Sequence, residues 1–157
     1  MSKTIKVAQP TPHRIIRTRR LDLDYPADTL PRHYVSDDVA MSHIVSMLSA
    51  VFPEGEDFFV QSVRNYRDSV TDPELKTQVA GFIGQEAMHS REHRAFNESL
   101  AQLGYPTRFV DRITGFGLGV GAKVLPKKVQ LAITAALEHY TATLAEVLLT
   151  DERAREL

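Results

Sequence analysis

Cysteine is absent from the 157 residues of this chain. Without thiols, the protein has no disulfide framework, no catalytic thiolate and no cysteine-ligated zinc or iron–sulfur cluster. Any metal ion must therefore be held by oxygen and nitrogen ligands. The length is that of one ordinary domain, which can bury a core without covalent or metal support.

The chain also lacks a strong charge of one sign and a long apolar run. Its 19 basic and 20 acidic residues leave a net charge of -1, which gives no general attraction to nucleic acid or acidic membranes. No segment reaches the roughly 20 apolar residues of a membrane span, and the N-terminus has no apolar signal segment. We expect a soluble, cytoplasmic protein without nucleic-acid or membrane partners, in which the arginines of residues 14–20 belong to a solvated arm.

Proline and hydrophobic periodicity divide the chain into two parts. Residues 1–36 are rich in proline and show no sustained period, so we expect an extended N-terminal arm with a short strand within residues 13–25. Residues 37–157 show helical periodicity. We predict that this second part is an all-α helical bundle.

The first helix of the bundle is expected to begin near residue 38. Ser36 or Asp37 can serve as its N-cap, because both side chains accept hydrogen bonds from the first turn. Pro53 should kink the helix or start a new turn, since it cannot donate a backbone hydrogen bond. The helical pattern then continues to about residue 70.

Three further helices are predicted. The sequence "DPELK" begins the second, which spans residues 72–103, and Gly104 supplies its C-terminal cap. Residues 107–125 carry glycine at alternate positions, so we expect a weak or broken helix there. Residues 127–149 are apolar almost all round, which predicts a buried helix.

Polar side chains interrupt the apolar face of the second helix. At 100° per residue, Glu86, His89 and His93 fall within one stripe of its surface. The other members of that stripe are Val79, Phe82, Ile83, Phe96 and Leu100. Glu92 falls on the solvated side. Glu86, His89 and His93 therefore take positions that a packed helix gives to core residues.

Two other helices place a carboxylate on an inner face. Glu56 shares a face with the apolar residues of its helix, whereas Glu54 lies nearly opposite. Glu138 lies in line with the apolar residues of the last helix. A buried ionised carboxylate costs several kcal/mol unless it is paired or bound to a cation. A metal site that includes Glu56, Glu86, His89 and Glu138 removes that cost.

The order of these ligands is typical of one class of metal site. One Glu, then Glu-x-x-His, then another Glu is the beginning of the ligand order in ferritin-like di-iron bundles. Iron suits such a carboxylate-rich set, as two ions if the site is complete, and manganese or zinc are alternatives. The final Glu-x-x-His of the pattern is missing, because residues 143–157 contain no histidine.

Three segments carry a resemblance to a known family. They are "FPEGEDFFVQSVRNYRD" at residues 52–68, "DPELKTQVAGFIGQEAMHSREHRAFN" at 72–97 and "AITAALEHYTATLAE" at 132–146. Over most of residues 20–150 the chain resembles the N-terminal half of the bacterial proteins described as predicted metal-dependent hydrolases. Members of that family continue with a second helical half that bears further metal ligands. The resemblance implies that this chain is the N-terminal part of a longer protein, or that another chain completes its site.

Two chemistries are consistent with the resemblance and the ligand pattern. In a hydrolase, the metal polarises a carbonyl or phosphoryl group of a small-molecule substrate, with His93 as the catalytic proton acceptor. In an oxygenase, a reduced iron pair activates O2 to oxidise a small apolar or aromatic substrate. His93 can instead be a further ligand, a group that holds a ligand in place, or a core histidine.

A non-enzymatic alternative keeps the helices without the chemistry. In it, the chain is a helical dimerisation fragment whose apolar faces, including residues 129–149, pack against a partner. A homo-oligomer is expected under either reading, unless the missing C-terminal half covers these faces.

Overall fold

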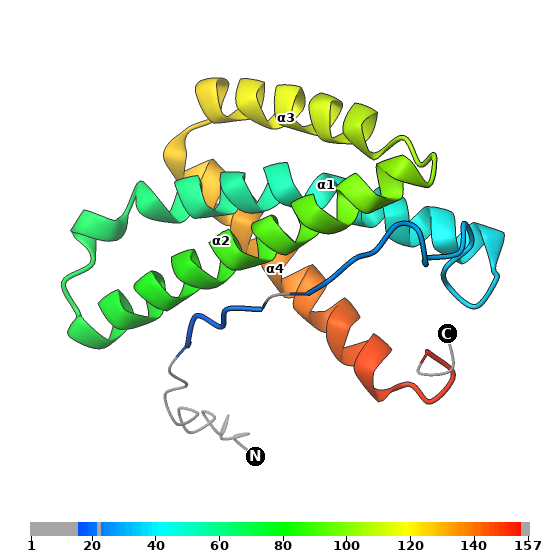
Figure 1. The fold of residues 1–157 in the computed structure, drawn as a ribbon. Coiled ribbons are helices and arrows are strands. Elements are labelled where there is room, and N and C mark those ends of the chain that lie inside the picture. Colours follow the sequence, from blue (N-terminus) through cyan, green and yellow to red (C-terminus); the bar gives the residue numbers. More distant parts are fainter. Residues whose placement is uncertain (1–15, 22, 155–157) are drawn as a thin grey trace, which may run out of the picture.

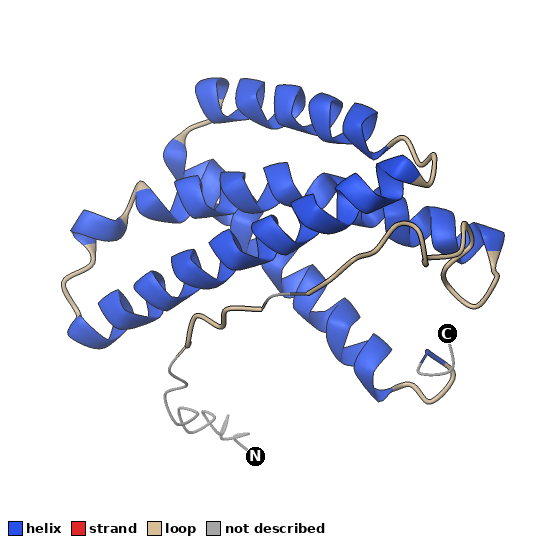
Figure 2. Cartoon of the chain, viewed as in Figure 1, coloured by secondary structure: helices blue, strands red, loops and turns tan. Residues whose placement is uncertain are grey.

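The computed structural model describes residues 16–21 and 23–154. These residues form four α-helices, one short 3-10 helix and no strand (Figure 2). The bounds are α1 Val39–Arg64, η1 Arg67–Ser69, α2 Pro73–Gln102, α3 Thr107–Val124 and α4 Lys127–Thr150. The predicted all-α helical bundle is confirmed. The strand expected within residues 13–25 does not form over the described part of that segment; residues 13–15 and 22 lie outside the described residues.

The N-cap of helix α1 lies one residue after Asp37 and two residues after Ser36, the two predicted caps. Asp38 is the N-cap, and its carboxylate accepts a hydrogen bond from the backbone N–H of Met41 at 2.9 Å. Ser36 and Asp37 instead adopt positive φ values of 46° and 60°, because they form the turn that leads into the helix. The helix then ends at Arg64, and the remaining predicted turn is the 3-10 helix η1.

Helix α2 has the predicted ends. Asp72 accepts a hydrogen bond from Leu75 N–H at 2.7 Å, and a proline occupies the first helical position. At the other end Gly104 has a φ of 91°, and the N–H of Tyr105 reaches back to the carbonyl of Leu100 at 3.0 Å. This is the Schellman arrangement that glycine permits without strain.

The third and fourth helices differ from their predictions. Helix α3 is continuous despite its glycines, because it packs along α1 and the missing Cβ of Gly115 leaves room for the side chain of Glu54. Helix α4 is mostly exposed instead of buried. Its buried residues are Gln130 and Thr134, and Tyr140 and Leu149 remain 64% and 69% exposed. Apolar side chains of α4 therefore face solvent in this chain.

Helices α1 and α2 form the centre of the fold (Figure 1). They lie side by side, α3 covers another side of α1, and α4 crosses the pair at its first half while its second half projects away. The small residues Ser46, Ser49 and Ala50 of α1 are buried, which lets neighbouring segments approach its backbone closely. The buried apolar residues are Ala50, Phe58, Phe59, Val60, Leu100 and Tyr105.

The described residues 16–21 and 23–25, called the arm below, run along α2 (Figure 1). Gly81 and Gly84 allow this contact, because a Cβ at either position would lie 2.2 Å from an atom of Ile16 or Thr18. Farther along, the N–H of Leu23 donates to the carboxylate of Glu92 at 3.4 Å.

The arm explains one wrong prediction. Glu92 was expected on the solvated side of its helix, but it is 9% exposed because the arm covers it. Arg91 donates to the same carboxylate and also to the backbone carbonyl of Leu21. In the part of the chain that the structure describes, no helix combines the length and apolar character needed to cross a membrane.

The glycine contacts predict opposite effects for two alanine substitutions. Gly117→Ala, in a helical position with open space around it, should raise the free energy of unfolding by about 0.5–1 kcal/mol. Gly81→Ala should give no such gain and should release the arm, because the new Cβ collides with the backbone of Ile16. Chemical denaturation and the rate of tryptic cleavage at the arm arginines measure both effects. Equal cleavage rates in the two variants would contradict the docking of the arm on α2.

Candidate metal centre

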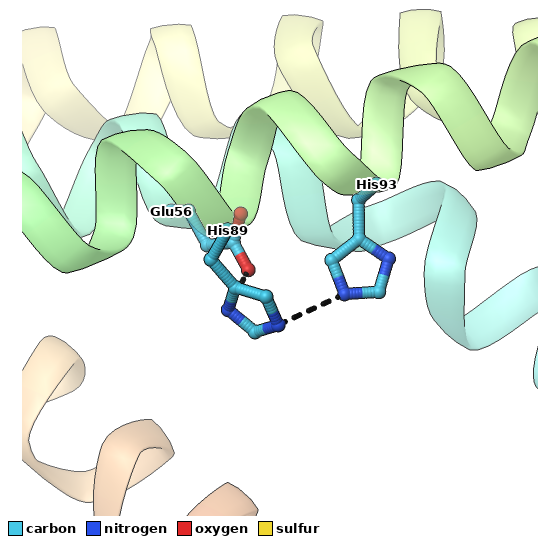
Figure 3. Close-up of side chains that lie close together, drawn as sticks. All are labelled: Glu56, His89 and His93. Atoms are coloured by element: carbon cyan, nitrogen blue, oxygen red, sulfur yellow. Dashed lines mark hydrogen bonds and ion pairs between the residues drawn. The ribbon is translucent and has the colours of Figure 1, made fainter. Parts of the chain in front are cut away.

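Three ligand-bearing side chains converge where α1 and α2 pack together. Glu56, His89 and His93 each offer one ligand atom, and these atoms lie within 4.8 Å of one another (Figure 3). His89 Nδ1 is 2.6 Å from Glu56 Oε1, and His89 Nε2 is 3.1 Å from His93 Nε2. His89 and His93 lie one helical turn apart in α2, so both rings are on the same side of that helix and face Glu56 of α1.

The carboxylate of Glu56 is buried with few partners. The residue is 1% exposed, and neither of its oxygens has a well-oriented hydrogen-bond donor among the described residues apart from the close approach of His89. Burial raises the pKa of this carboxyl above its ordinary value of 4.5. A buried acid with unused acceptor capacity is the feature that a bound cation would explain.

His89 stands between two carboxylates. Its Nδ1 faces Glu56 Oε1 at 2.6 Å and Glu86 Oε2 at 4.0 Å, and Glu86 is itself 7% exposed. The interactions with these acids, that with Glu56 first, raise the pKa of His89 to about 10. The imidazolium ring therefore supplies the positive charge that the acids need when no metal is present.

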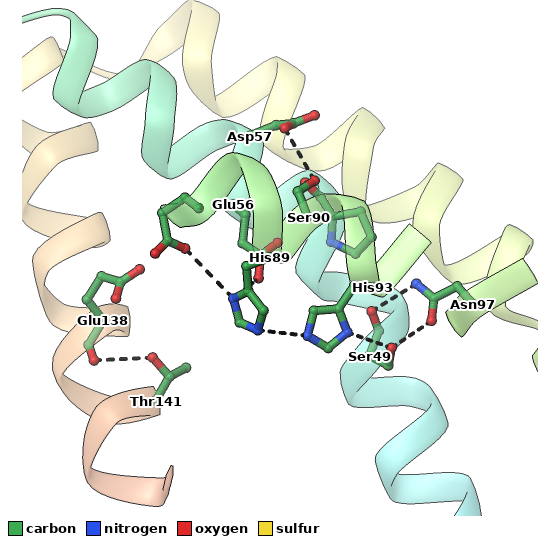
Figure 4. Close-up of polar contacts among 11 residues, drawn as sticks. Ser49, Glu56, Asp57, His89, Ser90, His93, Asn97, Glu138 and Thr141 are labelled. Carbon is green, nitrogen blue, oxygen red and sulfur yellow. Dashed lines mark hydrogen bonds and ion pairs between the residues drawn. The ribbon is translucent and has the colours of Figure 1, made fainter. Parts of the chain in front are cut away.

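The ring of His93 is held in one tautomer by its neighbours (Figure 4). The Nδ2 group of Asn97 donates to the backbone carbonyl of Ser49 at 3.0 Å, so Asn97 Oδ1 must face the Ser49 hydroxyl and accept its proton at 2.8 Å. The hydroxyl can then only accept from His93 Nδ1, which lies 2.8 Å away. The proton of His93 is thus on Nδ1, and the lone pair of Nε2 points toward His89.

Two further contacts support a neutral His93. Its ring stacks on Phe52 with a centroid distance of 4.6 Å and an interplanar angle of 10°. Burial and, to a smaller extent, the charge of His89 together lower the pKa of His93 to about 4. Metal-binding histidines commonly donate their second N–H to a neighbouring oxygen, which is the arrangement that Ser49 provides here.

Pro53 is linked to this arrangement through the backbone of α1. Proline has no N–H for the carbonyl four residues earlier, which is that of Ser49. Asn97 donates to that carbonyl instead, so the helix continues through Pro53 rather than ending there. The same amide group therefore satisfies α1 and orients the Ser49 hydroxyl toward His93.

Glu138 approaches from α4. Its carboxylate points from that helix toward the side where His89 lies (Figure 4). Partial burial raises its pKa to about 7, and the charges of Glu86 and Glu56 contribute to the rise. The charges of the four predicted metal ligands therefore influence one another. The three side chains whose ligand atoms lie closest together are, however, Glu56, His89 and His93, without Glu86 or Glu138.

Sequence reasoning missed Ser49 and Asn97. Both are small polar residues of kinds that occur everywhere on helix surfaces. A signal was available in the spacing, because Asn97 lies one turn after His93 and Ser49 lies one turn before Pro53. Neither spacing shows that α1 and α2 would bring the two residues together.

A groove of about 870 Å³ opens beside the centre, between the arm and α2. Glu86, His89, His93 and Glu138 contribute to its wall, so a small molecule in the groove reaches the candidate ligands. The half-exposed ring of His89, at 49%, faces this space. Pockets with a mainly apolar lining and a few polar groups are the usual sites of small-molecule binding.

The raised pKa of Glu138 predicts a pH-dependent stability effect. A raised pKa in the folded state means that ionisation is disfavoured, so stability is lost as the pH rises from 4.5 through about 7. In the metal-free protein, Glu138→Gln should therefore raise the free energy of unfolding at pH 8 by about 1 kcal/mol, allowing for solvent screening, and change it little at pH 5. Urea denaturation at the two pH values, with Glu146→Gln on the exposed face of α4 as the control, measures the difference. A gain that is equal at both pH values would contradict the assignment.

Comparison with known proteins gives one family. A family model described as predicted metal-dependent hydrolase matches residues 17–157, whereas no curated protein and no solved structure matches the chain. The matched region includes the arm from Arg17 onward, all four α-helices and every residue of the candidate centre. The chain therefore belongs to the family of predicted metal-dependent hydrolases.

Proposed function

We propose that the protein binds a divalent metal through Glu56, His89 and His93, with Glu86 and Glu138 as further ligands, and hydrolyses a small molecule held in the groove. The observation that carries the proposal is the buried carboxylate of Glu56, whose oxygens lack hydrogen-bond donors other than the nearby His89 among the described residues. The family assignment supports the same activity.

The donor set fits a metal ion of intermediate hardness. It offers carboxylate oxygen and imidazole nitrogen and no sulfur, which suits iron, manganese or zinc. In the metal-free protein, the proton of His89 Nδ1 points toward Glu56 Oε1, which lies 2.6 Å away, so this hydrogen bond occupies donor atoms that a cation would use. Metal binding should accordingly release protons from the centre.

The metal would polarise a carbonyl or phosphoryl oxygen and lower the pKa of a water molecule near the substrate. The protein's own groups prepare the site for this. Ser49 and Asn97 keep the proton of His93 on Nδ1, so Nε2 is free to bind. The low pKa of His93 makes it a weak proton acceptor in the metal-free protein, and we favour the ligand role over the catalytic one.

A second candidate function is oxidation by an iron pair. The specific observation in its favour is the number of carboxylates, because Glu56, Glu86 and Glu138 bring more negative charge to one site than a single divalent ion balances. Bridging by such carboxylates is typical of ferritin-like di-iron sites. Under this reading the centre activates O2 and the groove holds a small apolar or aromatic substrate.

The exposed apolar residues support an assembly larger than one copy of this chain. Phe109, Ile113 and Phe116 of α3 are 63%, 54% and 76% exposed and recur at helical spacing along one side. Exposed stripes of this kind usually meet another protein surface. We propose a homo-oligomer or a further helical segment as the partner. Analytical ultracentrifugation of the purified chain decides between them, because the first gives a mass above that of one chain and the second leaves the chain monomeric.

Metal content tests the proposed centre. Protein expressed in iron-supplemented medium should carry at least one metal ion per chain, and Glu56→Ala should reduce this to less than about a tenth. Ser49→Ala should weaken metal binding by about 10- to 100-fold, because His93 loses the group that fixes its tautomer. Elemental analysis and competition with a chelator measure these changes.

Ser62→Ala is the matched control for Ser49→Ala. Ser62 is also a buried serine of α1, and its hydroxyl bonds to Thr134 rather than to the centre. The control should lose stability without losing metal affinity. Equal metal affinity in the two serine variants would argue against the role of Ser49, and a wild-type protein without metal would overturn the proposed function.

Oxygen dependence separates the two reactions. The hydrolase should turn over model esters or amides without O2 and with zinc or manganese as well as iron. The oxygenase should instead show a change in the optical spectrum of its reduced iron form when air is admitted. Turnover under argon, measured by product release, decides between them, and activity that requires both iron and O2 would reject hydrolysis.

A further inference from the structure

The arm presents a distinct pattern to the groove. Every odd-numbered residue from 17 to 25 lines it, as expected for an extended segment whose alternate side chains point the same way. In order, these residues are Arg17, Arg19, Leu21, Leu23 and Tyr25. The acidic residue Asp24 does not line the groove. After Ile16, which also lines the groove, the described residues of the arm therefore offer two cations followed by three apolar side chains, and no carboxylate.

The two arginines are available to a ligand. Among the described residues, no carboxylate lies within ion-pair distance of Arg17 or Arg19. This distinguishes them from Arg91, Arg94 and Arg108, each of which pairs with an acid. A guanidinium group that borders a pocket and has no protein partner is suited to a carboxylate or phosphate.

The direction of the arm orders these groups along α2. Ile16 and Thr18 lie against Gly81 and Gly84, which puts the arginines beside the first half of α2. Tyr25 packs against Phe96 near the other end of the groove, with tilted rings at a centroid distance of 5.1 Å. The candidate ligands Glu86, His89 and His93 lie between these two ends in the sequence of α2.

We propose that the groove binds an amphipathic anion, with its carboxylate against Arg17 and Arg19 and its apolar body against Leu21, Leu23, Tyr25 and Phe96. The bond that joins the two parts then lies beside the candidate metal centre. An acyl chain linked through an amide to a carboxylate-bearing amine, as in an N-acyl amino acid, has this distribution of groups. The substrate class rests on the proposed hydrolytic function, whereas the binding of such an anion does not.

The reaction for this class balances without a further reactant. Water adds across the amide, so that a C–O bond forms at the acyl carbon as the C–N bond breaks. The oxygen of the water becomes part of the product carboxylate, and the amine takes up both protons of the water and leaves as an ammonium ion. No oxidant or reductant is consumed, which agrees with a hydrolase and not with the oxygenase alternative.

Calorimetric titration with N-decanoylglycine tests the binding, in the metal-free and the metal-loaded protein. Two matched probes accompany it: N-decanoylglycinamide, which lacks the charge, and N-acetylglycine, which lacks the apolar body. The full compound should bind at least about 10-fold more tightly than either probe, because each probe loses one of the two sets of contacts. Release of glycine by the metal-loaded protein is measured in parallel.

Variants of the arm assign the contact. Arg17→Gln combined with Arg19→Gln should abolish the preference for the acid over the amide and leave the metal content unchanged. Arg20→Gln is the control, since this exposed arginine of the same segment does not line the groove, and it should retain the preference. Equal binding of acid and amide by the wild-type protein, or an equal loss in the control, would overturn the proposal. Selective binding without glycine release would instead reject this substrate class for hydrolysis and leave the anion site in place.

Discussion

The burial of the Glu56 carboxylate between α1 and α2 is the constraint around which the site is arranged. A carboxylate that is 1% exposed loses its hydration, and the described residues return only one close partner, the ring of His89. That ring is drawn toward Glu56 and Glu86 together, which fixes the position of α2 against α1 at this level. The same contact between the two helices brings Ser49 of α1 within hydrogen-bond distance of His93 and Asn97 of α2. When no metal is bound, the protonated ring of His89 therefore balances the charge of these buried acids.

Sequence reasoning was most successful where one residue decides the structure. Asp72, Pro73 and Gly104 define the ends of α2, because capping and the conformation of glycine depend on local chemistry. The helical wheel also selected Glu56, Glu86, His89 and His93, because the spacing within a helix determines which side chains share a face. The family resemblance, which rested on the segments around these residues, is confirmed.

Sequence reasoning failed where the structure depends on packing between segments that are distant in the chain. The glycines of α3 were expected to break a helix that α1 in fact supports, and Glu92 was expected in solvent that the arm excludes. Helix α4 has the composition of a buried helix, but the described residues of this chain cover little of it. The periodicity of one segment does not show which of its residues another segment will cover. The ferritin-like arrangement and the identity of the metal stay predictions, since they depend on ligands that these helices alone do not supply.

Pro53 has a consequence that extends beyond the continuity of α1. By leaving the Ser49 carbonyl without a partner in its own helix, it recruits Asn97 from α2, and Asn97 in turn dictates where the proton of His93 resides. A residue with no titratable group therefore selects a tautomer on the neighbouring helix. Asn97 therefore serves two groups at once, because its amide N–H satisfies the carbonyl that Pro53 leaves free and its amide oxygen orients the Ser49 hydroxyl toward His93. The hydrogen bond that α1 lacks at Pro53 therefore helps to determine the chemistry of the candidate metal centre.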